Sequence, residues 1–89
     1  MSYTITTEAT NGMPAEARAT YGGCWIRILT GYDIVSNQYP VHVFVARDSF
    51  DKAHESKQPT DGMLFKSQER AFEFGYTYAV QRIDAGAAP

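Results

Sequence analysis

The chain has 89 residues, of which 44% are hydrophobic and 20% are charged. This composition is typical of a single small globular domain, in which residues 1–20 form an N-terminal lead-in and residues 21–89 form an α+β domain. No run of about 18 to 20 apolar residues occurs, which excludes a membrane-spanning helix. The first eight residues lack the basic and apolar regions of a secretory signal, so we expect a soluble cytoplasmic protein.

Charge and cysteine content exclude further classes of protein. Eight Lys and Arg are set against ten Asp and Glu, which gives a formal net charge of −2. No basic run is present, whereas nucleic-acid binders usually carry a basic patch that neutralises phosphates. Cys24 is the single cysteine, so neither an internal disulfide nor a cysteine-rich zinc site can form. A chain with a single cysteine favours a reducing compartment.

The first twenty residues have the weakest pattern. The alternation in residues 3–7 predicts an edge strand, and the Asn-Gly-Met-Pro stretch at 11–14 ends it. Residues 14–19 allow two interpretations. They begin a short helix, because proline suits the first helical position and alanines follow, or they form a flexible lead-in.

Two strong strands are predicted in the middle of the chain. Residues 24–30 are rich in β-branched and aromatic side chains that alternate, and residues 41–47 repeat the pattern with valines. Between them, residues 32–36 read as extended chain and residues 37–40, which end in a proline, as a turn. Residues 49–62 are polar and predict a loop.

A short strand at 63–66 leads into the clearest element, a helix over about 67–85. Ser67 is the expected N-cap, and Gly86 is suited to end the helix. Small residues recur four positions apart at Ala71, Gly75 and Ala79, which indicates that this side of the helix packs closely on a sheet. We therefore expect a three- or four-stranded, mainly antiparallel sheet with one C-terminal helix packed on one face.

Candidate catalytic and metal-binding residues are few. A Cys–His pair would need Cys24 with His42 or His54, but the alternation turns Cys24 inward and His42 outward. Asp51, His54 and Glu55 have the spacing of part of a metal site, and we interpret them as a solvated loop because no fourth ligand is suggested. No glycine-rich phosphate-binding motif occurs. We expect no enzyme activity, no metal and no cofactor.

The most informative predicted surface is the sheet face that the helix leaves open. One helix can cover only one face of a small sheet, so three interpretations remain: the N-terminal segment covers the open face, a second copy or another protein covers it, or a single-stranded nucleic acid or small ligand stacks on its aromatics. Aromatic and arginine side chains are typical of interaction sites. We favour a protein-interaction module that self-associates through this face. The residues predicted on it are Trp25, Arg27, Leu29, His42 and Phe44, beside Ala46.

The layout from Tyr21 to Asp84 resembles that of small bacterial domains of unknown function. The resemblance rests on Tyr21-Gly22-Gly23 before an Ile-rich strand, on Phe65-Lys66-Ser67 before the helix, and on the helical repeat of Ala71, Gly75, Ala79 and Ile83. It implies a bacterial cytoplasmic protein with a sheet and a C-terminal helix, and it implies no activity. The order of elements is also similar to that of double-stranded-RNA-binding domains, but their lysine-rich entry to the last helix is absent here.

Overall fold

The computed structural model describes residues 3–7, 15–47, 55–60 and 62–87. Within these ranges the chain forms one antiparallel sheet and one helix, which confirms the predicted α+β class. The elements in chain order are β1 (Thr4–Thr7), β2 (Ala15–Tyr21), β3 (Cys24–Thr30), β4 (Tyr39–Ala46), β5 (Ser56–Gln58), β6 (Leu64–Phe65) and α1 (Gln68–Asp84).

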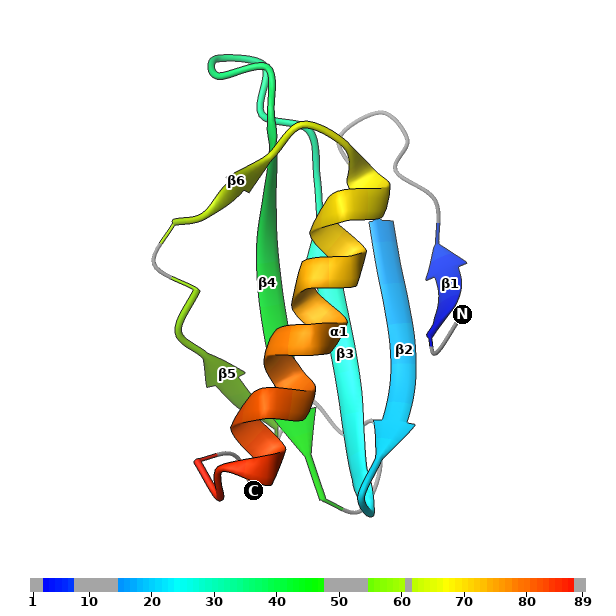
Figure 1. Ribbon diagram of the computed structural model, residues 1–89. Coiled ribbons are helices and arrows are strands. Elements are labelled where there is room, and N and C mark those ends of the chain that lie inside the picture. Colours follow the sequence, from blue (N-terminus) through cyan, green and yellow to red (C-terminus); the bar gives the residue numbers. More distant parts are fainter. Residues whose placement is uncertain (1–2, 8–14, 48–54, 61, 88–89) are drawn as a thin grey trace.

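The strands follow one another across the sheet in the order β1-β2-β3-β4-β5, and α1 lies in front of β2, β3 and β4 (Figure 1). The strand β6 pairs with the first residues of β4, whereas β5 pairs with its later part. The sheet has six strands instead of the predicted three or four. The two that the sequence did not indicate are β2 and β5.

The strand β2 corrects the prediction of a short helix or flexible lead-in at residues 14–19. Residues 15–21 pair with the whole of β3, and the two strands are joined by a tight turn in which Gly22 and Gly23 have φ angles of 56° and 80°. The alanines of β2 are buried beneath α1 while the residues between them face the other side. A period of two is the signature of a strand, and here it outweighs the helical propensity of alanine.

The hairpin between β3 and β4 turns earlier than predicted. The chain reverses at Asp33–Gln38, and Asn37 takes the left-handed conformation with a φ of 57°. The predictions of extended chain at 32–36 and of a turn at 37–40 are therefore wrong. Pro40 belongs to β4 instead, at a position before the β3 ladder begins, so its missing N–H removes no bond to β3.

The helix confirms its prediction closely. Ser67 is the N-cap, and its hydroxyl accepts a hydrogen bond of 3.2 Å from the Arg70 amide. At the other end, Gly86 has a φ of 72°. The residues that the helix buries against the sheet are Ala71, Phe72, Gly75 and Ala79.

Gly75 is the point of closest approach between α1 and the sheet. A Cβ atom added at Gly75 would lie 2.6 Å from Ile28 Cγ2 and 3.3 Å from Val41 Cγ2, both on buried side chains. Atoms at 2.6 Å overlap, and a close-packed core gives the isoleucine little room to move. The absence of a side chain at this position therefore sets the distance between helix and sheet.

We expect Gly75→Ala to destabilise the fold although alanine favours helices by about 1 kcal/mol over glycine. Overpacking typically costs about 1–3 kcal/mol, and the larger Gly75→Leu should cost more than Gly75→Ala. The measurement is the midpoint of urea unfolding, with Thr77→Ala on the exposed side of α1 as the control. A midpoint for Gly75→Ala at or above that of the wild type would contradict the close approach.

Candidate functional site

The sheet face opposite α1 carries all five residues that the sequence placed there. The pairing of β3 with β4 aligns Trp25 with Ala46, Arg27 with Phe44, and Leu29 with His42, so that both members of each pair lie on the same face. We call this the outer face. Among the described residues its side chains come from β1 (Thr4, Thr6), β2 (Glu16, Arg18, Thr20), β3 (Trp25, Arg27, Leu29), β4 (His42, Phe44, Ala46), β5 (Lys57) and from Glu55 just before β5.

The described part of the N-terminal segment does not cover the outer face. The strands β1 and β2 continue the sheet sideways, in its own plane (Figure 1). Tyr3, just before β1, packs on the helix side, where its ring centroid lies 5.8 Å from that of Phe72 and 6.2 Å from that of Tyr76. The interpretation that this segment folds over the outer face is therefore wrong for residues 3–7 and 15–21.

Arg27 is the centre of an ionic network on the outer face. It is only 7% exposed. Its guanidinium forms a two-pronged ion pair with Glu55, in which Nε donates to Oε2 at 3.1 Å and Nη2 donates to Oε1. A third nitrogen, Nη1, donates to Glu16 Oε1 at 3.4 Å. The guanidinium carbon also lies 4.5 Å from the centre of the Phe44 ring, within the range of a cation–π contact.

Glu16 extends the network to the neighbouring strands. Its Oε2 atom accepts hydrogen bonds from Arg18 Nε at 2.7 Å and from the Thr6 hydroxyl at 2.9 Å. Partial burial by itself would raise the pKa of Glu16. The hydrogen bonds from Arg18, Thr6 and Arg27, together with the charge of Arg18, lower it to a value below the ordinary 4.5. The carboxylate is therefore charged at neutral pH.

Glu55 has a different role from the one that the sequence suggested. Its side chain is only 7% exposed and is held by Arg27, so it does not belong to a solvated loop. Asp51 and His54, the other two residues of the possible metal site, lie outside the described residues. Within the described ranges no three metal-ligating side chains come together.

His42 and Cys24 lie on opposite faces of the sheet, as predicted. The Cys24 side chain is in the core beneath α1, whereas His42 is exposed on the outer face. Partial desolvation, and then the positive charge of nearby Lys57, lower the pKa of His42 below 6.5. The imidazole is therefore neutral at pH 7, and the sheet separates it from the thiol.

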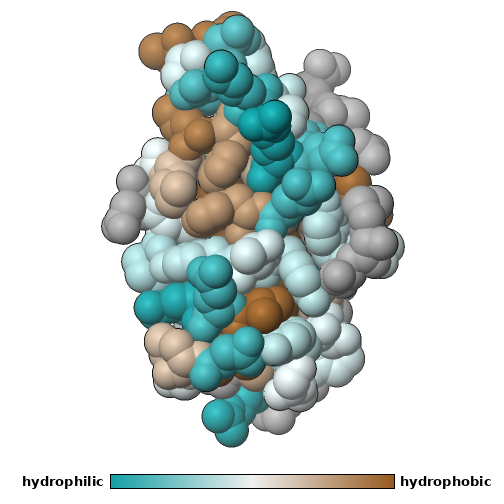
Figure 2. Space-filling view, viewed as in Figure 1, coloured by the Kyte–Doolittle hydropathy of each residue, from teal (hydrophilic) through white to brown (hydrophobic). Residues whose placement is uncertain are grey.

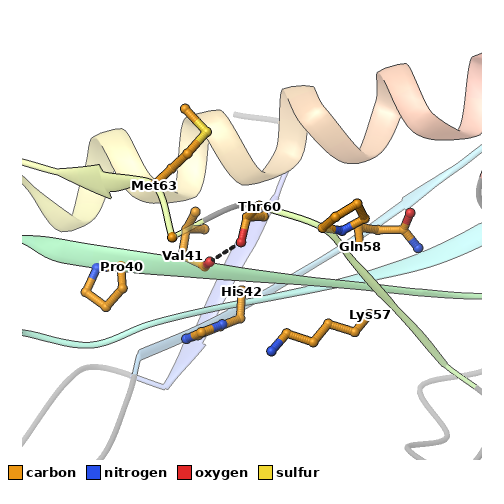
Figure 3. A pocket seen from close by; sticks show the side chains of 9 residues that line it. Pro40, Val41, His42, Lys57, Gln58, Thr60 and Met63 are labelled. Carbon is orange, nitrogen blue, oxygen red and sulfur yellow. Dashed lines mark hydrogen bonds between the residues drawn. The ribbon is translucent and has the colours of Figure 1, made fainter.

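A notch lies at the edge of β4, between β5 and β6, and His42 lines it. Figure 3 shows His42 and Lys57 on one side of β4, and Thr60 and Met63 on the other. The hydroxyl of Thr60 donates a 3.0 Å hydrogen bond to the Val41 carbonyl oxygen across the gap. Because the lining side chains divide between the two faces, their polar groups do not converge on one ligand position.

The roles of Glu16 and Glu55 in the network were not predicted from the sequence. Glu16 had a local signal, because residues 15–20 alternate strictly between alanine and polar side chains, which indicates a strand with a polar face. Glu55 had none, since it lies 28 residues from Arg27 along the chain. The alternation of β3 predicted that Arg27 lies on the outer face, but it did not predict that two carboxylates bury its guanidinium.

Comparison with protein-family models, with curated proteins and with solved structures finds no match to this chain. In the ranges that the structure describes, no helix is long and apolar enough to cross a membrane. The resemblance to small bacterial domains therefore stays a prediction.

We expect Glu55→Leu to destabilise the protein strongly, because it leaves the buried Arg27 guanidinium without its main partner. Removing one partner of a buried ion pair typically costs about 3–5 kcal/mol, whereas replacing both partners with apolar side chains costs much less. The double variant Arg27→Met/Glu55→Leu should therefore be more stable than Glu55→Leu alone. Urea unfolding of the wild type and of the two variants measures this, and a double variant that is less stable than Glu55→Leu would contradict the network.

The lowered pKa of Glu16 predicts how stability depends on pH. The pKa of this carboxyl is lower in the folded state than in the unfolded state, where it is near 4.5. Its charged form therefore stabilises the fold fully above about pH 4.5, and this contribution is lost as the pH falls through the pKa of the folded state. The free energy of unfolding should therefore decrease below about pH 4.5, and Glu16→Gln should make this decrease shallower. Unfolding curves measured between pH 7 and pH 3 test it. An unchanged slope in Glu16→Gln would show that the network does not depend on this carboxylate.

Proposed function

We propose that this chain is a small protein-interaction module that binds a second copy of itself through the outer face. The observation that carries the proposal is the β3–β4 register, which gathers Trp25, Leu29 and Phe44 on the face opposite α1. A single helix covers the other face, and the strands β1 and β2 widen the sheet instead of folding over it.

The composition of the outer face supports a protein contact. Protein interfaces combine an apolar, often aromatic centre with a polar rim, and Trp, Tyr and Arg dominate their binding energy. Here Leu29 and Phe44 are half-buried near the middle of the face, and the exposed Thr20, His42 and Lys57 surround them. The ion pairs of Arg27 fix the centre, so little side-chain entropy is lost on binding.

The charges of the outer face favour a second copy as the partner. Its described side chains carry two carboxylates, on Glu16 and Glu55, and three cations, on Arg18, Arg27 and Lys57. A two-fold contact brings the same face of each copy together, which a face with charge of one sign would oppose. A nearly balanced face meets its own copy without such repulsion.

The alternative is a binder of single-stranded nucleic acid or of a small ligand that stacks on the aromatics. Two observations make it the weaker candidate. The Phe44 ring already stacks with the Arg27 guanidinium, so a base would have to displace it. The carboxylates of Glu16 and Glu55 also stand where phosphates would approach, and they already use the positive charge of Arg27.

We propose a binding role and not a catalytic one. Catalysis needs titratable groups that converge on a reacting atom. Cys24 and His42, the two candidates that the structure describes, are divided by the sheet. A bacterial cytoplasmic location, expected from the sequence, suits a protein with one buried cysteine and stays a prediction.

Sedimentation equilibrium of the wild type and of Leu29→Glu tests the proposed contact. We expect the average mass of the wild type to rise above that of the monomer as its concentration rises towards about 1 mM, the upper end of weak association. Leu29→Glu should weaken this association about tenfold or more, because it buries a carboxylate in the contact. The matched control is Gln81→Glu on the exposed side of α1, away from the outer face, which should behave as the wild type.

Two results would overturn the proposal. One is a wild type that stays monomeric throughout this range. The other is equal association of Leu29→Glu and wild type when urea unfolding shows that both are folded. A salt-sensitive complex with a single-stranded oligonucleotide, lost in Phe44→Ala, would favour the alternative function.

A further inference from the structure

The tip of the β3–β4 hairpin exposes two aliphatic side chains that contribute nothing to the core. Ile34 is 81% exposed and Val35 is 92% exposed, the highest values among the large hydrophobic residues of the described ranges. The hairpin projects beyond the first turn of α1 at one end of the molecule (Figure 1). Tyr32, beside the tip, is also exposed.

Hydrogen bonds fix the backbone of this tip. The Asp33 carboxylate accepts a bond of 3.0 Å from the Val35 amide and one of 2.9 Å from the Ser36 hydroxyl, and these bonds lower the pKa of Asp33, the Ser36 bond most. The Asp33 amide donates to the Gln38 carbonyl at 2.8 Å, and the Asn37 amide donates to the Asp33 carbonyl at 2.8 Å. The tip therefore presents its two aliphatic side chains in a defined position.

Nothing in the fold requires aliphatic residues at the tip. Turns favour Gly, Pro, Asn, Asp and Ser, and Asp33, Ser36 and Asn37 already supply that chemistry. Ile34 and Val35 are β-branched, which suits strands better than turns, and they stay in water. Rigid apolar side chains at a protruding tip are typical of a contact that covers them.

A shallow groove lies between β6 and the first half of α1. Its floor is aromatic, since the ring centroids of Phe65 and Phe74 lie 4.9 Å apart. Arg70, Glu73 and Thr77, three exposed residues of α1, complete its lining. Figure 2 shows apolar surface over this region and at the hairpin end of the same face.

We propose that the hairpin tip of one copy inserts into this groove of a second copy. The tip and the groove lie at the same end of the molecule, so a two-fold axis between two copies allows each tip to enter the other copy's groove (Figure 1). Ile34 and Val35 then cover Phe65 and Phe74, and reciprocal exchange doubles the apolar area buried.

The charges agree with this pairing. The tip brings one carboxylate, on Asp33, and the groove carries one guanidinium, on Arg70, beside the carboxylate of Glu73. An approach of Asp33 towards Arg70 places opposite charges together at the rim of an apolar contact. This contact is on the helix side of the sheet, so it neither uses nor blocks the outer face and does not rest on the proposed function.

A membrane surface is the other occupant that exposed aliphatic side chains suggest. Insertion of a few apolar residues gives weak binding unless basic residues add attraction to anionic lipids. The hairpin from Gly31 to Pro40 carries no lysine or arginine, and its one charge is the Asp33 carboxylate. The chemistry of the tip therefore favours an apolar protein groove over a lipid surface.

A polarity-sensitive dye on the tip tests the proposal. The dye is attached to Val35→Cys in a Cys24→Ala background, so that a single thiol is labelled. Adding an excess of unlabelled wild type should shift the emission of the dye towards the blue, because the tip enters an apolar groove. Unlabelled Thr77→Arg places a long side chain in the groove. It should need about a tenfold higher concentration or more to give the same shift of the emission.

Further additions separate the possible occupants. Unlabelled Leu29→Glu, altered on the outer face alone, should shift the dye as well as the wild type does, whether or not the outer face self-associates. Vesicles of phosphatidylcholine, with or without phosphatidylserine, should leave the emission unchanged. The proposal is wrong if Thr77→Arg matches the wild type, or if the vesicles shift the dye and the protein does not.

A second measurement reports the contact directly. When Val35→Cys and Thr77→Cys, both in the Cys24→Ala background, are mixed and oxidised, a disulfide-linked heterodimer should form, because the bond needs Cα atoms within about 7 Å. The control replaces Thr77→Cys with Thr20→Cys, an exposed position on the outer face, and should give little heterodimer. Equal yields from the two mixtures would overturn the proposed contact.

Discussion

The contact of α1 with β3 at Gly75 is the constraint on which the rest of the structure depends. With no side chain at that position, the helix backbone rests against Ile28 and Val41, and the small residues Ala71 and Ala79 let it lie close along its length. A helix held this close buries the central part of one face of the sheet. It leaves the opposite face to be stabilised without a second layer of secondary structure among the described residues.

An ionic network lies at the centre of the outer face. Arg27 lies at its centre and joins Glu16 of β2, Phe44 of β4 and Glu55, just before β5, so that one guanidinium connects four neighbouring parts of the sheet. Removing a guanidinium from water costs free energy unless its N–H groups donate hydrogen bonds within the protein. Here all three nitrogens of Arg27 donate to carboxylates. Arg27 therefore gives the face rigidity and does not act as a mobile contact residue.

One hairpin supplies most of both proposed contact surfaces. The strands β3 and β4 present Leu29, His42 and Phe44 on the outer face, while their connecting turn presents Ile34 and Val35 at the end of the molecule. The turn is rigid because Asp33 satisfies its amides, and the strands are rigid because α1 packs on their other side. Fixed surfaces lose less entropy on binding than mobile ones, which suits a module whose role is association.

The sequence by itself determined the elements that have a local period: α1 with its cap at Ser67, the strands β3 and β4, and the residues that these two strands turn to the outer face. Tertiary structure decided the rest. The strand β2 alternates alanine with polar residues and is held extended by pairing with β1 and β3, and the partner of Arg27 is Glu55, 28 residues away. Periodicity reports which side of an element is apolar, because that depends on neighbours in the chain. Pairing between distant segments depends on the energy of the entire folded chain, so it cannot be predicted from a short stretch of sequence.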